Sequence, residues 1–365
     1  MDLLVQAVQA NCHIADARQA GDLPLCIYLL QMRELFRWEQ GLAFGAQIDR
    51  AALGQWLAQR EALWAELEGQ AFVPLGFGPR RFGVFDADGI NAELAPLGLV
   101  YGAGFAAAGR PSFFLAESFA SSWLEGGLPL HECGAELARC LFAPAAALSG
   151  GRGIVLRRES LARWLWEKFE TFSLRRADGP MKALAQAYGL NDASDFAGAL
   201  PRMLHELRET LVLHERGEFS AAQWLEPHWA AMRLGLGPDQ RRTDLCVRAV
   251  RDHIADLETT LPALIERGPE VALHFWFANY EGLRQDLFPN LIQGYAAWRN
   301  GDAGRSLMGL ARDGAVHFRA LAAQVLDLHQ SQGESAGPAI GRLLAAPQAV
   351  FALAPSVVLH AWRHK

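Results

Sequence analysis

The sequence has few cysteines and no excess of basic residues. Its five cysteines are an odd number and include no Cys-x-x-Cys pair, so neither a disulfide framework nor a zinc ribbon is expected. Charged residues form only 20% of the chain, and 34 lysines and arginines face 40 acidic residues. A surface that follows nucleic-acid phosphates needs a basic excess, so we expect no nucleic-acid partner.

Long apolar runs are also missing. The longest candidate, Ala349 to Leu359, falls short of the ~20 residues that span a bilayer, and it contains Pro355. The opening Met1-Asp2-Leu3 lacks the basic start of a secretion signal. We therefore expect a cytoplasmic protein with no membrane partner.

Common phosphate-binding and nucleophile motifs are absent from the sequence as well. It contains no Walker-type Gly-Lys-Ser/Thr loop and no Gly-x-Ser-x-Gly elbow. Gly102-x-Gly104 follows a β-prone run, but Pro111 would interrupt the helix that a dinucleotide-binding turn must open. A hairpin turn explains this segment better. No haem attachment motif is present either.

What the sequence does contain is apolar residues at helical spacing. Hydrophobic residues form 51% of the 365 residues, enough to bury one large core or two ordinary ones. Up to about Glu68, and again from Glu159 onward, these residues recur on one face of successive helices. Between these segments, glycine and proline are frequent and short β-prone runs occur. We predict a mainly α (α+β) fold, with a helical core and a small β-hairpin or sheet insertion in the N-terminal half.

The same patterns divide the chain into residues 1–157, a mixed α+β N-terminal part, and residues 158–365, a helical C-terminal part. Whether the two parts form one compact unit is left open. In the N-terminal part we predict a helix from Leu25 to near Gly41, a helix at Ala51–Leu67, and strands at Phe82–Phe85, Leu99–Tyr101, Ser112–Leu115 and Gly153–Leu156, the middle two paired around Gly109. In the C-terminal part the predicted helices are Glu159–Arg175, Lys182–Tyr188, Leu200–Glu215, Ala221–Leu234, Leu245–Arg267, Glu270–Asp286, Leu291–Arg299, Leu307–His329 and Ile340–Ala345, with Gly217 among the residues that end them.

Several ionisable side chains fall on helix faces that should be buried. Burying an unpaired charge is expensive, so such a group needs a partner, a ligand or a metal. The apolar series from Leu25 to Phe36 leads to Glu39, a candidate inward carboxylate. Glu34 and Arg37 on the same helix can pair one turn apart.

The helix predicted from Leu200 has an apolar face that ends in His214, with Glu206 at the edge of that face. These two residues are candidate site residues. A core histidine with satisfied hydrogen bonds is the alternative for His214. His205 and Glu209 are expected on the opposite side of the helix.

The next long helix places His253 within its apolar face and Asp256 at the edge, three residues away. An aspartate at this spacing orients a histidine ring, either in a core or at a metal. Asp252 is expected to point away from this face.

The segment from Leu273 to Glu281 is apolar nearly all round, as expected of a central buried helix. His274, Ala278 and Glu281 would share one face, and the small Ala278 leaves space between the two polar groups. We interpret this as the strongest local signal of a site. A buried His–Glu pair with a structural role is an equal alternative.

A polar cluster near the start of the chain reads Asn11-Cys12-His13-Ile14-Ala15-Asp16-Ala17. On a helix His13 and Asp16 would be neighbours. They could form a functional site, or they could cap a helix and hold the local structure through hydrogen bonds. Together with Met32-Arg33-Glu34-x-x-Arg37-Trp38-Glu39, this cluster resembles a family of uncharacterised bacterial proteins. The resemblance is clearest over the first forty or so residues. It implies a stand-alone bacterial cytosolic protein and carries no activity across.

We predict an enzyme that acts on a small molecule through a buried His/carboxylate site between helices, with a metal as candidate cofactor. Imidazole and carboxylate ligands suit iron, manganese or zinc. The predicted catalytic groups are Glu206, His274 and Glu281. The alternative is a non-catalytic helical binding or scaffold protein, in which the buried His–Glu pairs are structural and the 11 tryptophans build a core and an interface with a protein partner or a second copy. The candidate metal ligands are Glu39, Glu206, His214, His253, Asp256, His274 and Glu281.

Overall fold

The computed structural model describes residues 2–106, 110–141, 144–149 and 153–352. The chain divides into two compact units. The N-terminal unit comprises Met1–Arg176 and Tyr188–Arg208, and the C-terminal unit comprises Ala177–Ala187 and Glu209–Lys365. Among the described residues, no helix is both long and apolar enough to cross a membrane. Most of the apolar run from Ala349 to Leu359 lies outside the described residues.

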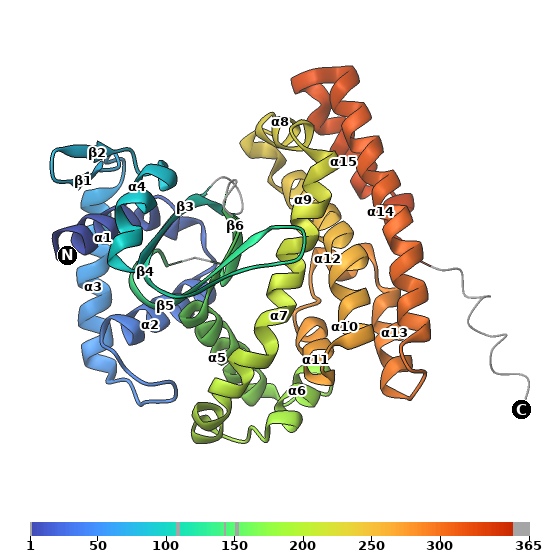
Figure 1. The fold of residues 1–365 in the computed structure, drawn as a ribbon, viewed down its shortest axis with the longest axis horizontal. Helices are drawn as coiled ribbons and strands as arrows, with labels where there is room; N and C mark the ends of the chain where they lie inside the picture. Colours follow the sequence, from blue (N-terminus) through green and yellow to red (C-terminus); the bar gives the residue numbers. More distant parts are fainter. Residues whose placement is uncertain (1, 107–109, 142–143, 150–152, 353–365) are drawn as a thin grey trace, which may run out of the picture. The chain divides into compact units, whose positions relative to one another are not determined.

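Helices of the N-terminal unit precede and follow its main sheet (Figure 1). Asp49 and Asp86 cap two of them, each accepting a hydrogen bond from the backbone N–H three residues later. The helices are α1 (Asp2–Ala17), α2 (Leu25–Glu39), α3 (Arg50–Leu67), α4 (Ala87–Leu94) and α5 (Arg158–Arg175), with short 3-10 turns at Ala20–Asp22 and Ala95–Leu97.

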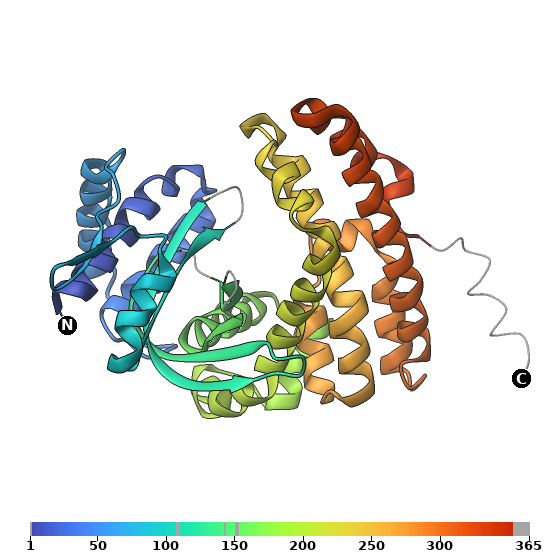
Figure 2. The ribbon, with the colours of Figure 1, turned by 45° about the horizontal axis from the view of Figure 1, so that its top comes forward.

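The main sheet of this unit has five strands in the order β3-β4-β5-β7-β6, and its only parallel pair is β5–β7 among the described strands. Register shifts between β4 and β5 accompany the bend of these strands in Figure 2. In the predicted hairpin Tyr101 pairs with Leu115, whereas Gly109 lies outside the described residues. The strands are β3 (Leu99–Ala106), β4 (Arg110–Trp123), β5 (Pro129–Arg139), β6 (Ala146–Ser149) and β7 (Gly153–Arg157), with a separate hairpin of β1 (Leu75–Phe77) and β2 (Arg80–Phe82).

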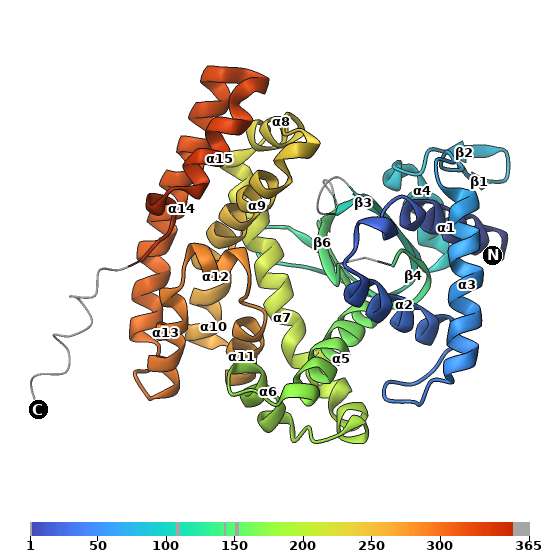
Figure 3. The same cartoon turned by 180° about the vertical axis from the view of Figure 1, so that it is seen from behind.

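Apolar clusters hold the N-terminal unit together. In the larger cluster α1 packs on β4 and β5, and these elements can be followed in Figure 3. Val8 and Cys12 of α1 are buried in this cluster together with Phe113 and Leu115. The smaller cluster joins α2 to α3 through Met32, Leu35 and Trp64. Because α3 packs against both α1 and α2, polar residues of these three helices come into contact.

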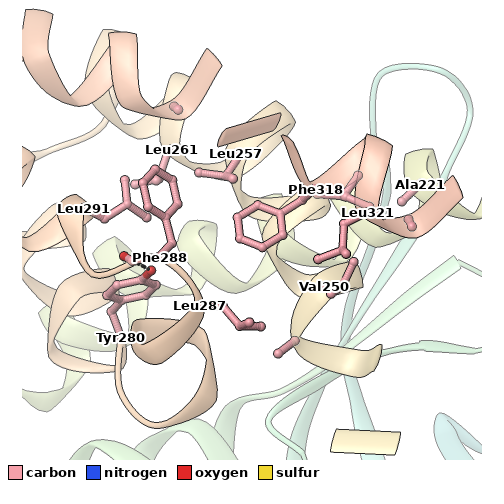
Figure 4. Packing of buried hydrophobic residues seen from close by; sticks show 14 of the residues in the cluster. Ala221, Val250, Leu257, Leu261, Tyr280, Leu287, Phe288, Leu291, Phe318 and Leu321 are labelled. Atoms are coloured by element: carbon pink, nitrogen blue, oxygen red, sulfur yellow. Dashed lines mark hydrogen bonds between the residues drawn. The ribbon is translucent and has the colours of Figure 1, made fainter. Parts of the chain in front are cut away.

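The C-terminal unit is helical throughout its described part. One core runs through it, and Figure 4 shows Phe288 and Phe318 packed among leucines of several helices. Helices α6 (Pro180–Tyr188) and α7 (Ala193–Leu225) cross the boundary between the units. The other helices are α8 (His228–Leu234), α9 (Arg241–Ala255), α10 (Leu261–Arg267), α11 (Glu270–Ala278), α12 (Leu283–Leu287), α13 (Asn290–Arg299), α14 (Arg305–Gln332) and α15 (Gly337–Ala345), with a π-helical turn at Asp256–Thr260 and 3-10 turns at Pro238–Gln240, Gly333–Ala336 and Pro347–Ala349.

The predicted fold class is confirmed: the protein is mainly helical, with small sheets in its N-terminal half. Three element predictions were wrong. Gly217 does not end a helix but lies inside α7. The helix predicted to continue to Asp286 ends at Ala278, and α12 begins only after Gly282, whose φ is +62°. Of the strand predicted at 82–85, only Phe82 is in β2.

Candidate functional site

A cluster of charged side chains links α7 to α9 within the C-terminal unit. The Nδ1 atom of His214 in α7 donates to Oδ1 of Asp256 at 2.8 Å. Asp256 opens the π-helical turn after α9, and its other oxygen accepts from Nη1 of Arg284 in α12 at 2.7 Å. The exposed fraction of Asp256 is only 1%, so both oxygens of this buried carboxylate are bound by groups that carry or can carry a positive charge.

Close packing of two helix backbones brings these residues together. His214 and Glu218 lie one turn apart on α7, and Asp252 and Asp256 lie one turn apart on the facing helix, so each pair shares one helix face. Gly217 lies between the first pair, and a Cβ atom placed on it would fall 2.4 Å from the carbonyl oxygen of Ala255. The glycine therefore allows the backbones of α7 and α9 to lie closer together than any larger residue at position 217 would permit.

His214, Glu218 and Asp252 form a group that could hold a metal ion. Each offers one ligand atom, and the three atoms all lie within 4.8 Å of one another in a half-buried position. The Nε2 atom of His214 faces Oε1 of Glu218 at 3.8 Å, while Oε2 of Glu218 pairs with Nη2 of Arg251 at 3.1 Å. Nε2 of His214 and Oε1 of Glu218 therefore face each other. The second nitrogen of His214 is bound to Asp256, and the second oxygen of Glu218 is paired with Arg251.

Asp252 was expected to point away, and this expectation was wrong. Its carboxylate is half-buried and faces His214 and Glu218 of α7. The sequence carried a signal that could have found it, because Asp252 is four residues before Asp256 and must share its face. Which neighbouring helix covers that face could not be read from the sequence.

The charged residues of this cluster shift one another's pKa values. Burial by itself lowers the pKa of His214, but the nearby Asp256, Glu218 and Asp252 outweigh it and raise that pKa to about 10. Burial raises the pKa of Asp252 to about 6, even though His214 opposes this change. For Asp256, the same His214 and Arg284 overcome burial and hold the pKa well below its usual value.

His253 lies beside this network in a structural role. Burial, and then the charge of Arg284, lower its pKa to about 3, so the ring is neutral. Its Nε2 is 2.9 Å from the carbonyl oxygen of Arg284, which can only accept, so the proton is on Nε2. The ring also stacks on Phe318 at 4.1 Å. His253 therefore fixes the backbone of Arg284, whose guanidinium binds Asp256.

His274 and Glu281 do not share the helix face that their spacing suggested. His274 is half-buried, and its Nδ1 lies 2.8 Å from the hydroxyl oxygen of Tyr295. Burial, followed by the charge of Arg299, lowers the pKa of His274. Glu281 is exposed and lies beyond the last residue of α11, so it shares no helix face with His274.

Glu39 and Glu206 belong to the N-terminal unit, apart from this cluster. Glu39 is half-buried and is bound by Arg60 through two hydrogen bonds of 2.8 and 2.7 Å. Glu206 accepts from the hydroxyl of Tyr188 at 2.7 Å. Glu206 precedes His214 by eight residues on α7. Among the seven predicted ligands, His214 and Asp256 are hydrogen-bonded to each other.

Arg60 of α3 also joins the two segments that carried the family resemblance. Its Nη1 lies 2.9 Å and 2.7 Å from the ring nitrogens of His13 in α1, while its Nη2 binds Glu39 in α2. Burial, and then the charge of Arg60, lower the pKa of His13 to about 3. Arg60, Glu218, Asp252 and Arg284 were not among the site residues predicted from the sequence. Arg60, Asp252 and Arg284 have partners on other helices. Glu218 lies one turn after His214 on α7, and that spacing could have indicated it.

Comparison with known proteins gives a family but no activity. Residues 3–157 match the N-terminal domain of a family of unknown function (DUF6866), and residues 162–347 match the C-terminal domain of the same family. No curated protein and no solved structure matches the chain significantly.

Proposed function

The chain belongs to this family of unknown function, and we propose that it is a metal-dependent enzyme whose divalent ion binds His214, Glu218 and Asp252. The observation that carries the proposal is the convergence of one imidazole and two carboxylates from two helices, with their ligand atoms within 4.8 Å of one another. Such a set suits iron, manganese or zinc. The proposed substrate is a small molecule that approaches from the half-exposed side of the group.

The surroundings of the three residues fit a bound ion. Ligand atoms held ~2.1 Å from one ion lie roughly 3–3.5 Å apart, so the group must contract, which the long side chain of Glu218 allows. Asp256 accepts from Nδ1 of His214 and leaves Nε2 as the ligand atom. A carboxylate in this position is the common support of a metal-bound histidine, since it fixes the ring and its tautomer.

Three protein ligands leave coordination positions open for water or substrate, as in catalytic metal sites. An ion bound there supplies a Lewis acid or an activated water. Within the chain, Asp256 orients His214, Arg284 balances the charge of Asp256, and Arg251 holds the second oxygen of Glu218. The proposal therefore does not use the remaining candidates from the sequence, which are Glu39, Glu206, His253, His274 and Glu281.

Metal binding to the purified full chain tests the proposal. After chelation and dialysis, Mn²⁺, Fe²⁺ or Zn²⁺ would be titrated calorimetrically, and bound metal would be measured by elemental analysis. We expect one ion per chain, and we expect Asp252→Asn and Glu218→Gln to weaken the affinity at least tenfold. Glu209→Gln, at an exposed position of the same helix, is the matched control and should bind as the unchanged chain does. Absence of saturable binding, or equal weakening in the control, would overturn the proposal.

One observation favours the scaffold alternative instead. Three acidic groups, Glu218, Asp252 and Asp256, face three groups that can be positive, His214, Arg251 and Arg284. A network balanced in this way can be purely structural. In that case Asp252→Asn and Glu218→Gln lower the stability of the chain, and no metal ion binds to it at stoichiometric amounts.

A further inference from the structure

A second group of charged residues, away from the proposed metal site, is enclosed in the N-terminal unit. Arg139 is the last residue of β5 and Arg157 the last residue of β7, and their exposed fractions are 1% and 2%. Both reach the same oxygen of Glu136: Nη2 of Arg157 lies 2.8 Å from Oε2, and Nη1 of Arg139 lies 3.5 Å from it. The other oxygen of Glu136 accepts from the hydroxyl of Ser160 at 2.6 Å.

The guanidinium of Arg139 has one whole edge without an acceptor. Its Nε and Nη2 are buried, and neither has a hydrogen-bond partner in the part of the chain that the structure describes. One face of the group is covered by the ring of Trp38, 4.6 Å from Cζ. The Nε–Nη2 edge presents two parallel N–H groups, which is the arrangement that pairs with two oxygens of a carboxylate or a phosphate. Nε of Arg157 is also buried without a partner among these residues.

Arg37, another buried arginine of this unit, has more partners from the chain than Arg139 has. Its exposed fraction is 5%, and its Nη1 donates to the carbonyl oxygens of Ala43 at 2.7 Å and Ala46 at 3.2 Å. Its Nε makes no hydrogen bond among the described residues, but it lies 3.3 Å from Oε2 of Glu34 in an ion pair. Both the Nη1 and the Nε sides of Arg37 therefore face oxygen atoms of the chain, whereas the Nε–Nη2 edge of Arg139 has no such partner among the described residues.

Two arginines and two glutamates act on the charge of Arg139, namely Arg157, Arg163, Glu136 and Glu159. The pKa of Arg139 is lowered to about 10, first by burial and then by the charge of Arg163, although Glu136 and Glu159 oppose the change. Arg163 is itself bound by Leu141 through a backbone carbonyl at 3.2 Å. Burying N–H groups of a cation without acceptors is strongly unfavourable. Because the described residues supply no acceptor for the Nε–Nη2 edge of Arg139, a bound group that accepts from it would stabilise the folded chain.

We propose that Arg139 and Arg157 form an enclosed binding site for the oxyanion of a small ligand, a carboxylate or a phosphate. The ligand accepts two parallel hydrogen bonds from Nε and Nη2 of Arg139 and a third from Nε of Arg157. Glu136 holds the two guanidinium groups in place, and Ser160 holds Glu136. This site is independent of the proposed metal site, because all its residues belong to the N-terminal unit.

Anion binding by the full chain tests this proposal. The melting temperature and calorimetric heats would be measured with increasing inorganic phosphate and, separately, acetate, against chloride at matched ionic strength and pH. We expect a saturable rise in melting temperature with one of the two anions, which also tells a phosphate site from a carboxylate site. Arg139→Gln should weaken binding of that anion at least tenfold. Arg37→Gln removes another buried arginine, which donates to two backbone carbonyl oxygens and pairs with Glu34, so it should lower the melting temperature without changing the affinity for the anion.

Arg139→Lys covers the case in which Arg139→Gln does not fold. It keeps the positive charge but loses the two-pronged edge, and it too should bind the anion more weakly than the unchanged chain does. The proposal is wrong if neither phosphate nor acetate binds saturably to the unchanged chain, or if the Arg139 variants bind the anion as tightly as the unchanged chain does. In that case enclosed water accepts the hydrogen bonds of the guanidinium.

Discussion

Gly217 of α7 packs directly on the backbone of Ala255 in α9. A side-chain carbon at position 217 would lie 2.4 Å from the carbonyl oxygen of Ala255, closer than such atoms approach in folded proteins. This contact lies between His214 and Glu218 on one helix and between Asp252 and Asp256 on the other. The geometry of the charged cluster therefore depends on the absence of one methyl group.

We expect Gly217→Ala to destabilise the chain. The added methyl group must push the two helices apart, and overpacking of this kind costs about 1–3 kcal/mol. Alanine's better helix propensity offsets up to ~1 kcal/mol of that loss. Denaturant unfolding measures the difference. Gly309→Ala is the matched control, because Gly309 lies in α14 with no atom within 4 Å of the added carbon, and this change should leave stability equal or slightly higher. Equal effects of the two substitutions would contradict the role given to the contact.

Asp256→Asn should lower the free energy of unfolding by roughly 2–3 kcal/mol. Breaking one side of a buried ion pair costs several kcal/mol, and partial exposure of His214 and Arg284 reduces that figure. An asparagine can accept with only one of its two terminal atoms, so one of the two donors loses its acceptor. Asp313→Asn, at an exposed position of α14, should change stability by less than about 0.5 kcal/mol. A similarly small change for Asp256→Asn would show that the cluster does not contribute to stability.

The buried carboxyl of Asp16 predicts a pH dependence for the N-terminal unit. Its oxygens accept from the backbone N–H of Leu141 at 3.0 and 2.9 Å, yet burial raises its pKa to about 8. Between about pH 4 and 8 the folded chain holds a proton that the unfolded chain has lost, so stability falls as pH rises through this window. The slope from this group reaches at most ~1.4 kcal/mol per pH unit.

Asp16→Asn should remove this slope, because the amide oxygen still accepts from Leu141 and nothing titrates. The unfolding midpoint of the variant, measured at pH 5 and pH 8, should change less than that of the unchanged chain. Asp49→Asn removes an exposed carboxylate that caps α3, and it should lower stability by a similar amount at both pH values. A parallel pH profile for Asp16→Asn and the unchanged chain would be incompatible with a protonated Asp16.

Arg60→Gln should raise the pKa of His13, measured by NMR titration of its ring. The pKa is held at about 3 first by burial and then by the charge of Arg60. Removing that charge while keeping a hydrogen-bond donor leaves only burial, so the new value should lie between about 3 and the ordinary 6.5. Arg50→Gln, at the exposed start of α3, should leave the titration of His13 unchanged. No change in Arg60→Gln would mean that burial alone sets this pKa.

The amino-acid sequence by itself determined most of the helical segments and several of the side chains that face inward. Apolar residues recur every three or four positions in α9 and α14, and this spacing is a local property that tertiary packing did not alter. The same spacing placed His253 on a buried face and Asp256 at its edge, and both side chains are buried in the structure. It also predicted a small sheet between helical segments, because β-prone runs and turn residues alternate there.

Only the tertiary structure decided which polar groups meet. Asp252 acquires partners because Gly217 lets α7 approach α9, and nothing local to Asp252 indicates that neighbour. Glu281 does not share a helix face with His274 because α11 ends at Ala278. His13, Glu39 and Arg60 come from three helices and meet through pairings between residues distant in sequence. Periodicity specifies the face of a helix, whereas the neighbour that covers the face depends on how the whole chain packs.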